Sequence, residues 1–269
     1  MGLAACAKVQ SVKAETHKNP NPGGKSAQRL LPGLSVKDGF TRHPFDAEFG
    51  VRTSGLIAGR HLRSGHAHDR HVTAYYGVAP SVLHALIRRW QRSRPPSRME
   101  ETTFVDLGAG MGRAVLLASE LGFNSVAGVE LHPMLARIAR KNVSLWRAAG
   151  RERAPMRIVE GDATEFALPV GPVLVFLFNP FGAAVLRRLL KGWRNTPAKD
   201  APANALDLIY VNNEQEGVLE SEQGWTRLFL GKVRRSKADA IADHKIMANQ
   251  PEGEYASSNW EDCSMWRRE

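Results

Sequence analysis

The residues best suited to chemistry begin with Asp106 and the glycines that follow it. Glycines stand at 108, 110 and 112, directly after the apolar run 103–107. Alternate glycines remove the Cβ atoms from the bend, so the backbone can turn tightly and a ligand can lie against it. The helix expected from residue 114 presents free N–H groups and a positive dipole end. This stretch therefore predicts a binding turn for a molecule that carries a carboxylate or a phosphate.

Three further polar residues stand where apolar stretches end. Glu130 closes the stretch 125–130, Asp162 follows 157–161, and Asn179 follows 173–178. If these stretches are parallel strands, their carboxyl ends lie at one edge of the sheet, where open α/β sheets bind ligands. The four groups are therefore expected around a single site.

The elements that must position these residues alternate along the chain. Residues 172–178 are apolar without alternation, which predicts a strand covered on both faces. Helical spacing is expected after Pro133 and again from about 185 to 190. Strands are expected at 104–107, 125–130, 157–161, 172–178, 206–211, 225–230 and 263–267, the last two joined by a polar region. The fold class predicted is α/β: a Rossmann-like, seven-stranded, doubly wound, mostly parallel sheet with helices on both faces and an N-terminal extension.

The chain upstream of this domain is less regular. Residues 1–38 are rich in Lys, Pro, Gly, Asn and Ser, which predicts a disordered basic tail. Residues 39–98 are expected to form a lid or substrate segment that ends in a helix starting at Pro80. The breaker cluster 93–97 separates it from the main domain at 99–269.

The glycine turn distinguishes two nucleotide-binding patterns. The dinucleotide fingerprint needs a third glycine at 113, where this sequence has Arg113. An acidic residue followed by G-x-G-x-G instead resembles motif I of the class I S-adenosylmethionine-dependent methyltransferases. The resemblance implies S-adenosylmethionine as cofactor, with Glu130 on the ribose hydroxyls, Asp162 on the adenine amino group and Arg113 on the methionine carboxylate. The full cofactor set that it implies is Asp106, Gly108, Ala109, Gly110, Gly112, Arg113, Glu130, Leu131, Asp162, Ala163 and Asn179.

The segment Asn179-Pro180-Phe181 is similar to the Asp/Asn-Pro-Pro-Tyr/Phe motif of N-methyltransferases, with one proline missing. The resemblance implies that Asn179 and the Pro180 carbonyl position the nucleophile, while Phe181 and Tyr75 or Tyr76 wall the methyl channel. Residues 75–190 also resemble, distantly, the non-SET histone lysine methyltransferases. The implied reaction is an in-line methyl transfer to an N or O atom.

Each of these residues has a structural alternative. Asp106 could cap the turn, Glu130 could be a solvated acid, and Asp162 could close an Asx turn. Arg113 could lie on the outer face of its helix. The segment 179–181 could be a strand-ending turn that packs Phe181 inside. Two other functions also remain open: a cofactor-binding protein without catalysis, and a nucleotide-dependent oxidoreductase.

Composition restricts the partners further. The formal net charge is +10, which attracts polyanions without identifying nucleic acid as the substrate. The basic residues are expected mostly on solvated helix faces, and the acceptor is expected to be a protein side chain or a small molecule, with nucleic acid possible. His66, His68 and His71 fit no metal-binding spacing and are expected in a solvated loop, so no metal is predicted. Two cysteines near opposite ends and no long apolar run predict a cytoplasmic protein without a membrane partner.

Overall fold

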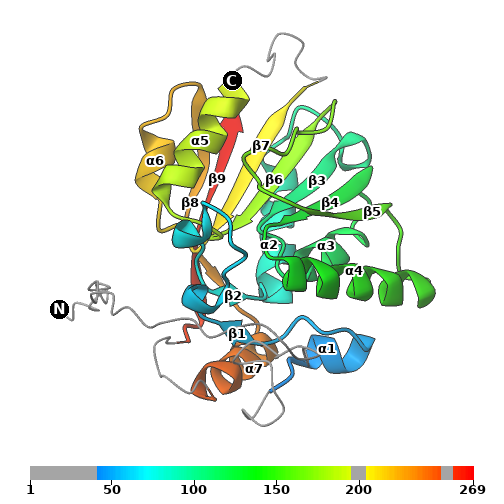
Figure 1. Cartoon of the computed structure of the whole chain (residues 1–269). Helices are drawn as coiled ribbons and strands as arrows, with labels where there is room; N and C mark the ends of the chain where they lie inside the picture. The colour runs from blue at the N-terminus through cyan, green and yellow to red at the C-terminus, as the bar shows by residue number, and fades with distance from the viewer. Residues whose placement is uncertain (1–40, 195–203, 250–256) are drawn as a thin grey trace, which may run out of the picture. The chain divides into compact units, whose positions relative to one another are not determined.

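A computed structural model describes residues 41–194, 204–249 and 257–269. By its contacts the chain divides into two units, Met1–Leu30 and Leu31–Glu269. The first unit and the tail predicted at 1–38 lie outside the described residues. The account below concerns the second unit (Figure 1).

The core is a seven-stranded sheet in the order β5-β4-β3-β6-β7-β9-β8. The first five strands in this order pair in parallel, and β9 pairs antiparallel with both β7 and β8. The predicted fold class is confirmed. The strands are β3 (Thr103–Leu107), β4 (Ser125–Glu130), β5 (Met156–Glu160), β6 (Val173–Phe178), β7 (Leu206–Val211), β8 (Trp225–Arg234) and β9 (Trp260–Arg268).

Strand register brings the predicted chemistry to one edge. Asp106 pairs with Gly128 on one side and with Phe176 on the other. Glu130 pairs with Glu160 on the next strand. The carboxyl ends of β5, β4, β3 and β6 therefore lie side by side.

Helices cover both faces because successive strand residues point to opposite sides. On one face, side chains such as Phe104, Val126 and Leu174 share a cluster with α2, α3 and α4. On the other face, Val105 and Val175 share a cluster with α5 and α6. The helices are α2 (Pro80–Arg92), α3 (Arg113–Ala118), α4 (Pro133–Ala148), α5 (Ala183–Arg194) and α6 (Glu216–Glu220).

A segment that precedes α2 lies against the glycine turn. It contains α1 (Pro44–Phe49), two 3-10 turns (Gly59–His61 and Asp69–His71) and a small antiparallel sheet of β1 (Leu56–Ile57) and β2 (Tyr75–Tyr76). Ile57, Leu62 and Tyr75 pack with Met111 and Leu135 in a small hydrophobic cluster of their own. Residues 43–78, called the cover segment below, are thus joined to the turn by apolar packing. The domain division at residue 98 stays a prediction.

The structure differs from the sequence-based expectation mainly near the C-terminus. α7 (Lys237–Ala248) occupies a region that was expected to be polar and irregular. Its buried residues include Asp239 and Asp243, so no apolar stripe marks it as a helix. Cys263 is a buried free thiol. Among the described residues, no helix is long and apolar enough to cross a membrane.

Candidate functional site

A cavity opens at the carboxyl edge of the sheet, under the cover segment. Most of the predicted site residues line it, although they come from five separate parts of the chain. Gly112 and Asn179 are absent from the lining. The predicted residues that do line the cavity are Tyr75, Tyr76, Asp106, Gly108, Ala109, Gly110, Arg113, Glu130, Leu131, Asp162, Ala163, Pro180 and Phe181.

The glycine turn needs its glycines for two reasons. All three have positive φ values, 84° at Gly108, 55° at Gly110 and 87° at Gly112, which side chains with a Cβ rarely adopt. A Cβ at Gly108 would also lie 2.2 Å from Cβ of Pro180, and one at Gly110 would lie 2.2 Å from the ring of Tyr75. The turn is therefore packed by the protein itself as well as open to the cavity.

Glu130 is a buried member of this turn, with 7% of its surface exposed. Its carboxylate accepts the N–H of Gly110 at 2.7 Å and the N–H of His132 at 2.8 Å. Burial nevertheless raises the pKa of Glu130 above its ordinary value. The alternative of a solvated acid is wrong.

Asp106 is buried beneath the turn, and among the described residues its carboxylate takes part in no hydrogen bond. The alternative in which Asp106 caps the turn therefore has no contact to support it. Burial raises its pKa to about 8, and the nearby Glu130 adds to this shift. A protonated Asp106 offers an O–H donor to the cavity, and an ionised one is a strong acceptor.

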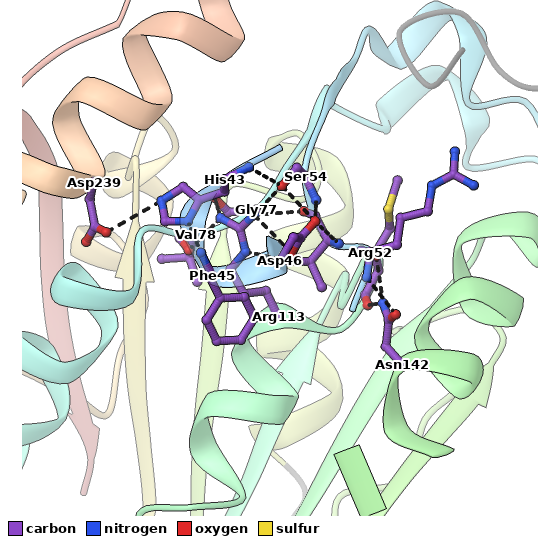
Figure 2. A network of polar contacts seen from close by, with 12 residues as sticks. His43, Phe45, Asp46, Arg52, Ser54, Gly77, Val78, Arg113, Asn142 and Asp239 are labelled. Carbon is purple, nitrogen blue, oxygen red and sulfur yellow. Dashed lines mark hydrogen bonds and ion pairs between the residues drawn. The ribbon is translucent and has the colours of Figure 1, made fainter. Parts of the chain in front are cut away.

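Arg113 has a different role from either one expected. It is 3% exposed, so a place on the outer face of its helix is wrong. Its N–H groups donate to the carbonyls of Gly77 and Val78 at 3.1 and 3.3 Å. The remaining three N–H groups of the guanidinium donate to the Thr53 hydroxyl, the Thr53 carbonyl and the Ser54 hydroxyl. Figure 2 shows the guanidinium beside the labelled Asp46, whose carboxylate is 4.0 Å away.

These five hydrogen bonds use all five N–H donors of the guanidinium. Asp46 in turn accepts the N–H groups of Thr53 and Ser54 at 2.6 and 2.7 Å. Arg113 and Asp46 thus fasten both ends of the cover segment to α3. While this arrangement holds, no N–H of Arg113 is left for a cofactor carboxylate.

Asp162 forms the Asx turn that was considered for it, since Oδ1 accepts the N–H of Thr164 at 2.8 Å. Its Oδ2 lies 2.9 Å from Nδ1 of His68 and 3.9 Å from Nε2 of His66. Of the three histidines expected in a solvated loop, His68 therefore lines the cavity, whereas His66 and His71 do not. No local signal could reveal this contact, because Asp162 is far along the chain from both histidines.

Asn179, predicted to position the nucleophile, already takes part in hydrogen bonds within the chain. It adopts a left-handed φ of 42°, and its side-chain oxygen accepts the hydroxyl of Tyr210 at 3.2 Å. Its carbonyl accepts the Thr73 hydroxyl, and the Pro180 carbonyl accepts the Thr73 N–H at 3.3 Å. Each of these oxygens thus accepts one hydrogen bond from this chain and retains a second acceptor position, so their role in holding a nucleophile stays a prediction. Thr73 and Tyr210, which sequence reasoning missed, bind them.

The tyrosines and Phe181 are fixed by the same cover segment. Tyr75 lies on Gly110 and donates to the Thr53 carbonyl at 2.7 Å. Tyr76 packs edge-to-face with Phe178, with ring centroids 6.4 Å apart. Phe181 forms an isolated antiparallel β-bridge with Val72. Its side chain is buried, as the structural alternative for 179–181 expected, and it also lines the cavity. Burial raises the pKa of both tyrosines, so their hydroxyls stay protonated at neutral pH.

Comparison with known proteins finds similarity in fold. No family model and no curated protein matches the sequence. Among solved structures, a precorrin-6y C5,15-methyltransferase from Geobacter metallireducens is 19% identical, with a TM-score of 0.43 over 66% of this chain and 85% of that one. A methyltransferase from Geobacter sulfurreducens, solved with S-adenosyl-L-homocysteine, is 11% identical, with a TM-score of 0.43 over 71% and 91%. The magnesium protoporphyrin IX methyltransferase from Synechocystis is 11% identical, with a TM-score of 0.42 over 71% and 79%.

Proposed function

We propose that the protein is an S-adenosylmethionine-dependent methyltransferase that acts on an N or O nucleophile. The observation that carries the proposal is the line of acids at three adjacent strand ends. Asp106 and Glu130 lie at the carboxyl ends of β3 and β4, Asp162 follows β5, and all three line one cavity beside the glycine turn. A nucleoside with two ribose hydroxyls and an exocyclic amine presents donors that match this series of acceptors.

Each part of the cavity then has a partner in the cofactor. Glu130 would receive the ribose hydroxyls, since each of its oxygens already takes one N–H and retains a second acceptor position. Asp162 and the Ala163 backbone would bind the adenine ring. This requires that His68 move away from Oδ2 of Asp162. The methionine part would lie along 108–110, beneath Tyr75.

The bound cofactor supplies an activated methyl group, so the protein mainly provides orientation and a cavity that excludes water. Phe178, Phe181 and Val185 give the acceptor side of the cavity an apolar wall. Pro180 lines the cavity and its carbonyl retains a second acceptor position for the nucleophile, and Thr73 and Tyr76 line the cavity with it. A neutral amine acceptor needs no general base.

One observation favours a second candidate. The carbonyls of Asn179 and Pro180 already accept hydrogen bonds from Thr73, which suits a protein that binds the cofactor without transferring its methyl group. The two candidates predict equal cofactor binding and differ in turnover. Incubation of host lysate with radiolabelled methyl donor, followed by separation into protein, RNA and small molecules, distinguishes them.

Calorimetric titration with S-adenosylhomocysteine tests the binding step. Glu130→Gln should weaken binding by about 1–3 kcal/mol, the range for a lost hydrogen bond to a charged group. Glu160→Gln is the matched control, because Glu160 pairs with Glu130 on the next strand but is exposed outside the cavity. Folded wild-type protein that binds neither the cofactor nor its product would contradict both candidates.

A further inference from the structure

Two histidines and one carboxylate converge at the rim of the cavity. His66 and His68 belong to the cover segment, and Asp162 follows β5. One potential ligand atom from each lies within 4.8 Å of the other two. In tetrahedral zinc sites, nitrogen and oxygen ligands about 2.0–2.2 Å from the ion are themselves separated by roughly 3.3 Å, so small shifts of side chains would bring these three atoms onto one ion.

The short approach of His68 to Asp162 is compatible with two ligands of one ion. The Nδ1 and Oδ2 atoms are 2.9 Å apart, yet Nδ1 is buried and has no hydrogen-bond partner. A neutral His68 with its proton on Nε2 would direct the Nδ1 lone pair toward this carboxylate, and a cation bound by both atoms would satisfy the two groups. The other oxygen of Asp162 is held by the Thr164 N–H, which fixes the direction of the carboxylate.

The other acid and the other histidine of this loop, Asp69 and His71, have hydrogen-bond partners of their own. Asp69, the acid within the same loop, accepts from Ser64 and from the N–H of Gly65 at 2.8 Å. His71 is bound differently, since its Nε2 accepts from Nε of Arg70 at 3.1 Å. The convergent set is therefore limited to two imidazoles and one carboxylate, a donor set typical of Zn²⁺ sites that keep one position for water.

We propose that His66, His68 and Asp162 bind a divalent transition metal ion of the Zn²⁺ type. The ion would be held by Nε2 of His66, Nδ1 of His68 and Oδ2 of Asp162, with water completing a tetrahedron. Because the histidines lie on the cover segment and the carboxylate lies on the sheet, the ion fastens the segment over the cavity. The site stands independently of the proposed methyltransferase activity.

Coordination by His66 changes one contact of the loop. Nδ1 of His66 now accepts the N–H of His68 at 3.2 Å, which places the imidazole proton on Nε2. To bind a metal through Nε2, the proton must move to Nδ1 and this contact must open. His68 and Asp162 thus provide the stronger ligands, and loss of either should weaken binding more than loss of His66.

The test is titration of the untagged full-length protein with Zn²⁺ by calorimetry and with Co²⁺ by visible absorption. We expect the dissociation constant to rise at least 10-fold in His68→Ala and Asp162→Asn, and by a smaller factor in His66→Ala. His71→Ala is the matched control, because this neighbouring histidine is outside the set, and its binding should equal that of the wild type. Thermal unfolding without metal confirms that each variant is folded.

Two results would overturn the site: wild-type affinity in folded His68→Ala and Asp162→Asn, or an equal loss in His71→Ala. A second measurement connects the site to the cavity. Because Asp162 is also the proposed acceptor for adenine, saturating Zn²⁺ should lower the affinity for S-adenosylhomocysteine, and the nucleoside should lower Zn²⁺ affinity by the same factor. If the protein binds Zn²⁺ but no nucleoside, the metal site stands and the proposed function fails.

Discussion

The glycine turn and the strand end at 179–182 lie side by side at one edge of the sheet, yet different parts of the chain hold them. The turn is fixed by its own neighbours in the sheet: Val129 accepts the N–H groups of Gly108 and Ala109, and Glu130 accepts that of Gly110. The strand end is held in large part by the cover segment, since His71 accepts the Gly182 N–H and Thr73 binds Asn179 and Pro180, although Tyr210 of β7 also donates to Asn179.

This difference separates two steps of the proposed function. The cofactor side is organised before any ligand arrives, because the sheet that carries it also holds its backbone. The acceptor side has its present geometry only while the cover segment is docked. Movement of that segment would change the acceptor side and leave the turn in place.

The largest expected effect is at Arg113, which links the two regions. Arg113→Met removes the guanidinium and leaves Asp46 buried without its cation, which should lower the free energy of unfolding by about 3–5 kcal/mol. Urea denaturation measures the loss. Arg137→Met, on an exposed site of α4, should change stability by less than about 0.5 kcal/mol. If Arg113→Met were equally mild, the fastening of the cover segment would not depend on this residue.

The next effect concerns the pH dependence of the turn region. Asp106 has a pKa of about 8 when folded and an ordinary, lower value when unfolded, so the folded state binds its proton more tightly. The protonated state therefore stabilises the fold at low pH, and stability falls as the pH rises toward 8. Between pH 5 and 7 the loss is about 2–3 kcal/mol, from about 1.4 kcal/mol per pH unit.

Asp106→Asn should remove this part of the pH dependence, because the amide does not titrate. Urea unfolding of both proteins at pH 5, 7 and 9 measures it. Because Glu130 contributes to the raised pKa of Asp106, the two carboxyls titrate as a pair, and the difference between the proteins measures Asp106 together with its coupling to Glu130. Parallel pH profiles for the two proteins would show that Asp106 is ionised throughout.

A smaller effect is expected for Gly110→Ala, which sharpens the view that the turn is preorganised. The new Cβ would meet the ring of Tyr75 at a residue with positive φ, which should cost about 2 kcal/mol of stability and abolish measurable S-adenosylhomocysteine binding. Gly161→Ala provides the control, since this glycine also lines the cavity but has nothing within 4 Å of its Cβ position. Retained binding in Gly110→Ala would place the ligand away from the turn.

The smallest effect is expected at the strand end. Tyr210→Phe removes the hydroxyl that Asn179 accepts and should cost about 1 kcal/mol, the usual net value of one hydrogen bond. Asn179→Ala should cost a similar amount, leave S-adenosylhomocysteine affinity within a few-fold and reduce turnover. The double variant should lose less than the sum of the two single losses, because both remove the Tyr210–Asn179 contact, while Tyr210→Phe alone also removes the acceptor of the Gln215 N–H. A loss of cofactor affinity in Asn179→Ala would move this residue into the cofactor site.

Much of the fold could be predicted from the sequence because strands and their covering helices leave local patterns. The apolar stretch at β6, the strand at 206–211 and the helix after Pro133 were found at or near their observed bounds. α7 was missed because its buried face carries Asp239 and Asp243, and a helix with polar residues inside lacks the usual period. The glycine turn and the strand-end acids were also visible, since each is local to one element.

The contacts that define the candidate site required the tertiary structure. Arg113 donates to the hydroxyl of Thr53, which is 60 residues away in the sequence, and Thr73 donates to the carbonyl of Asn179, 106 residues away. The approach of His68 to Asp162 is equally non-local. A sequence by itself determined which residues could donate and accept at the sheet edge, because residue type sets hydrogen-bonding capacity. Only the folded chain decided which of those groups are already occupied, because docking of the cover segment brings distant partners within reach.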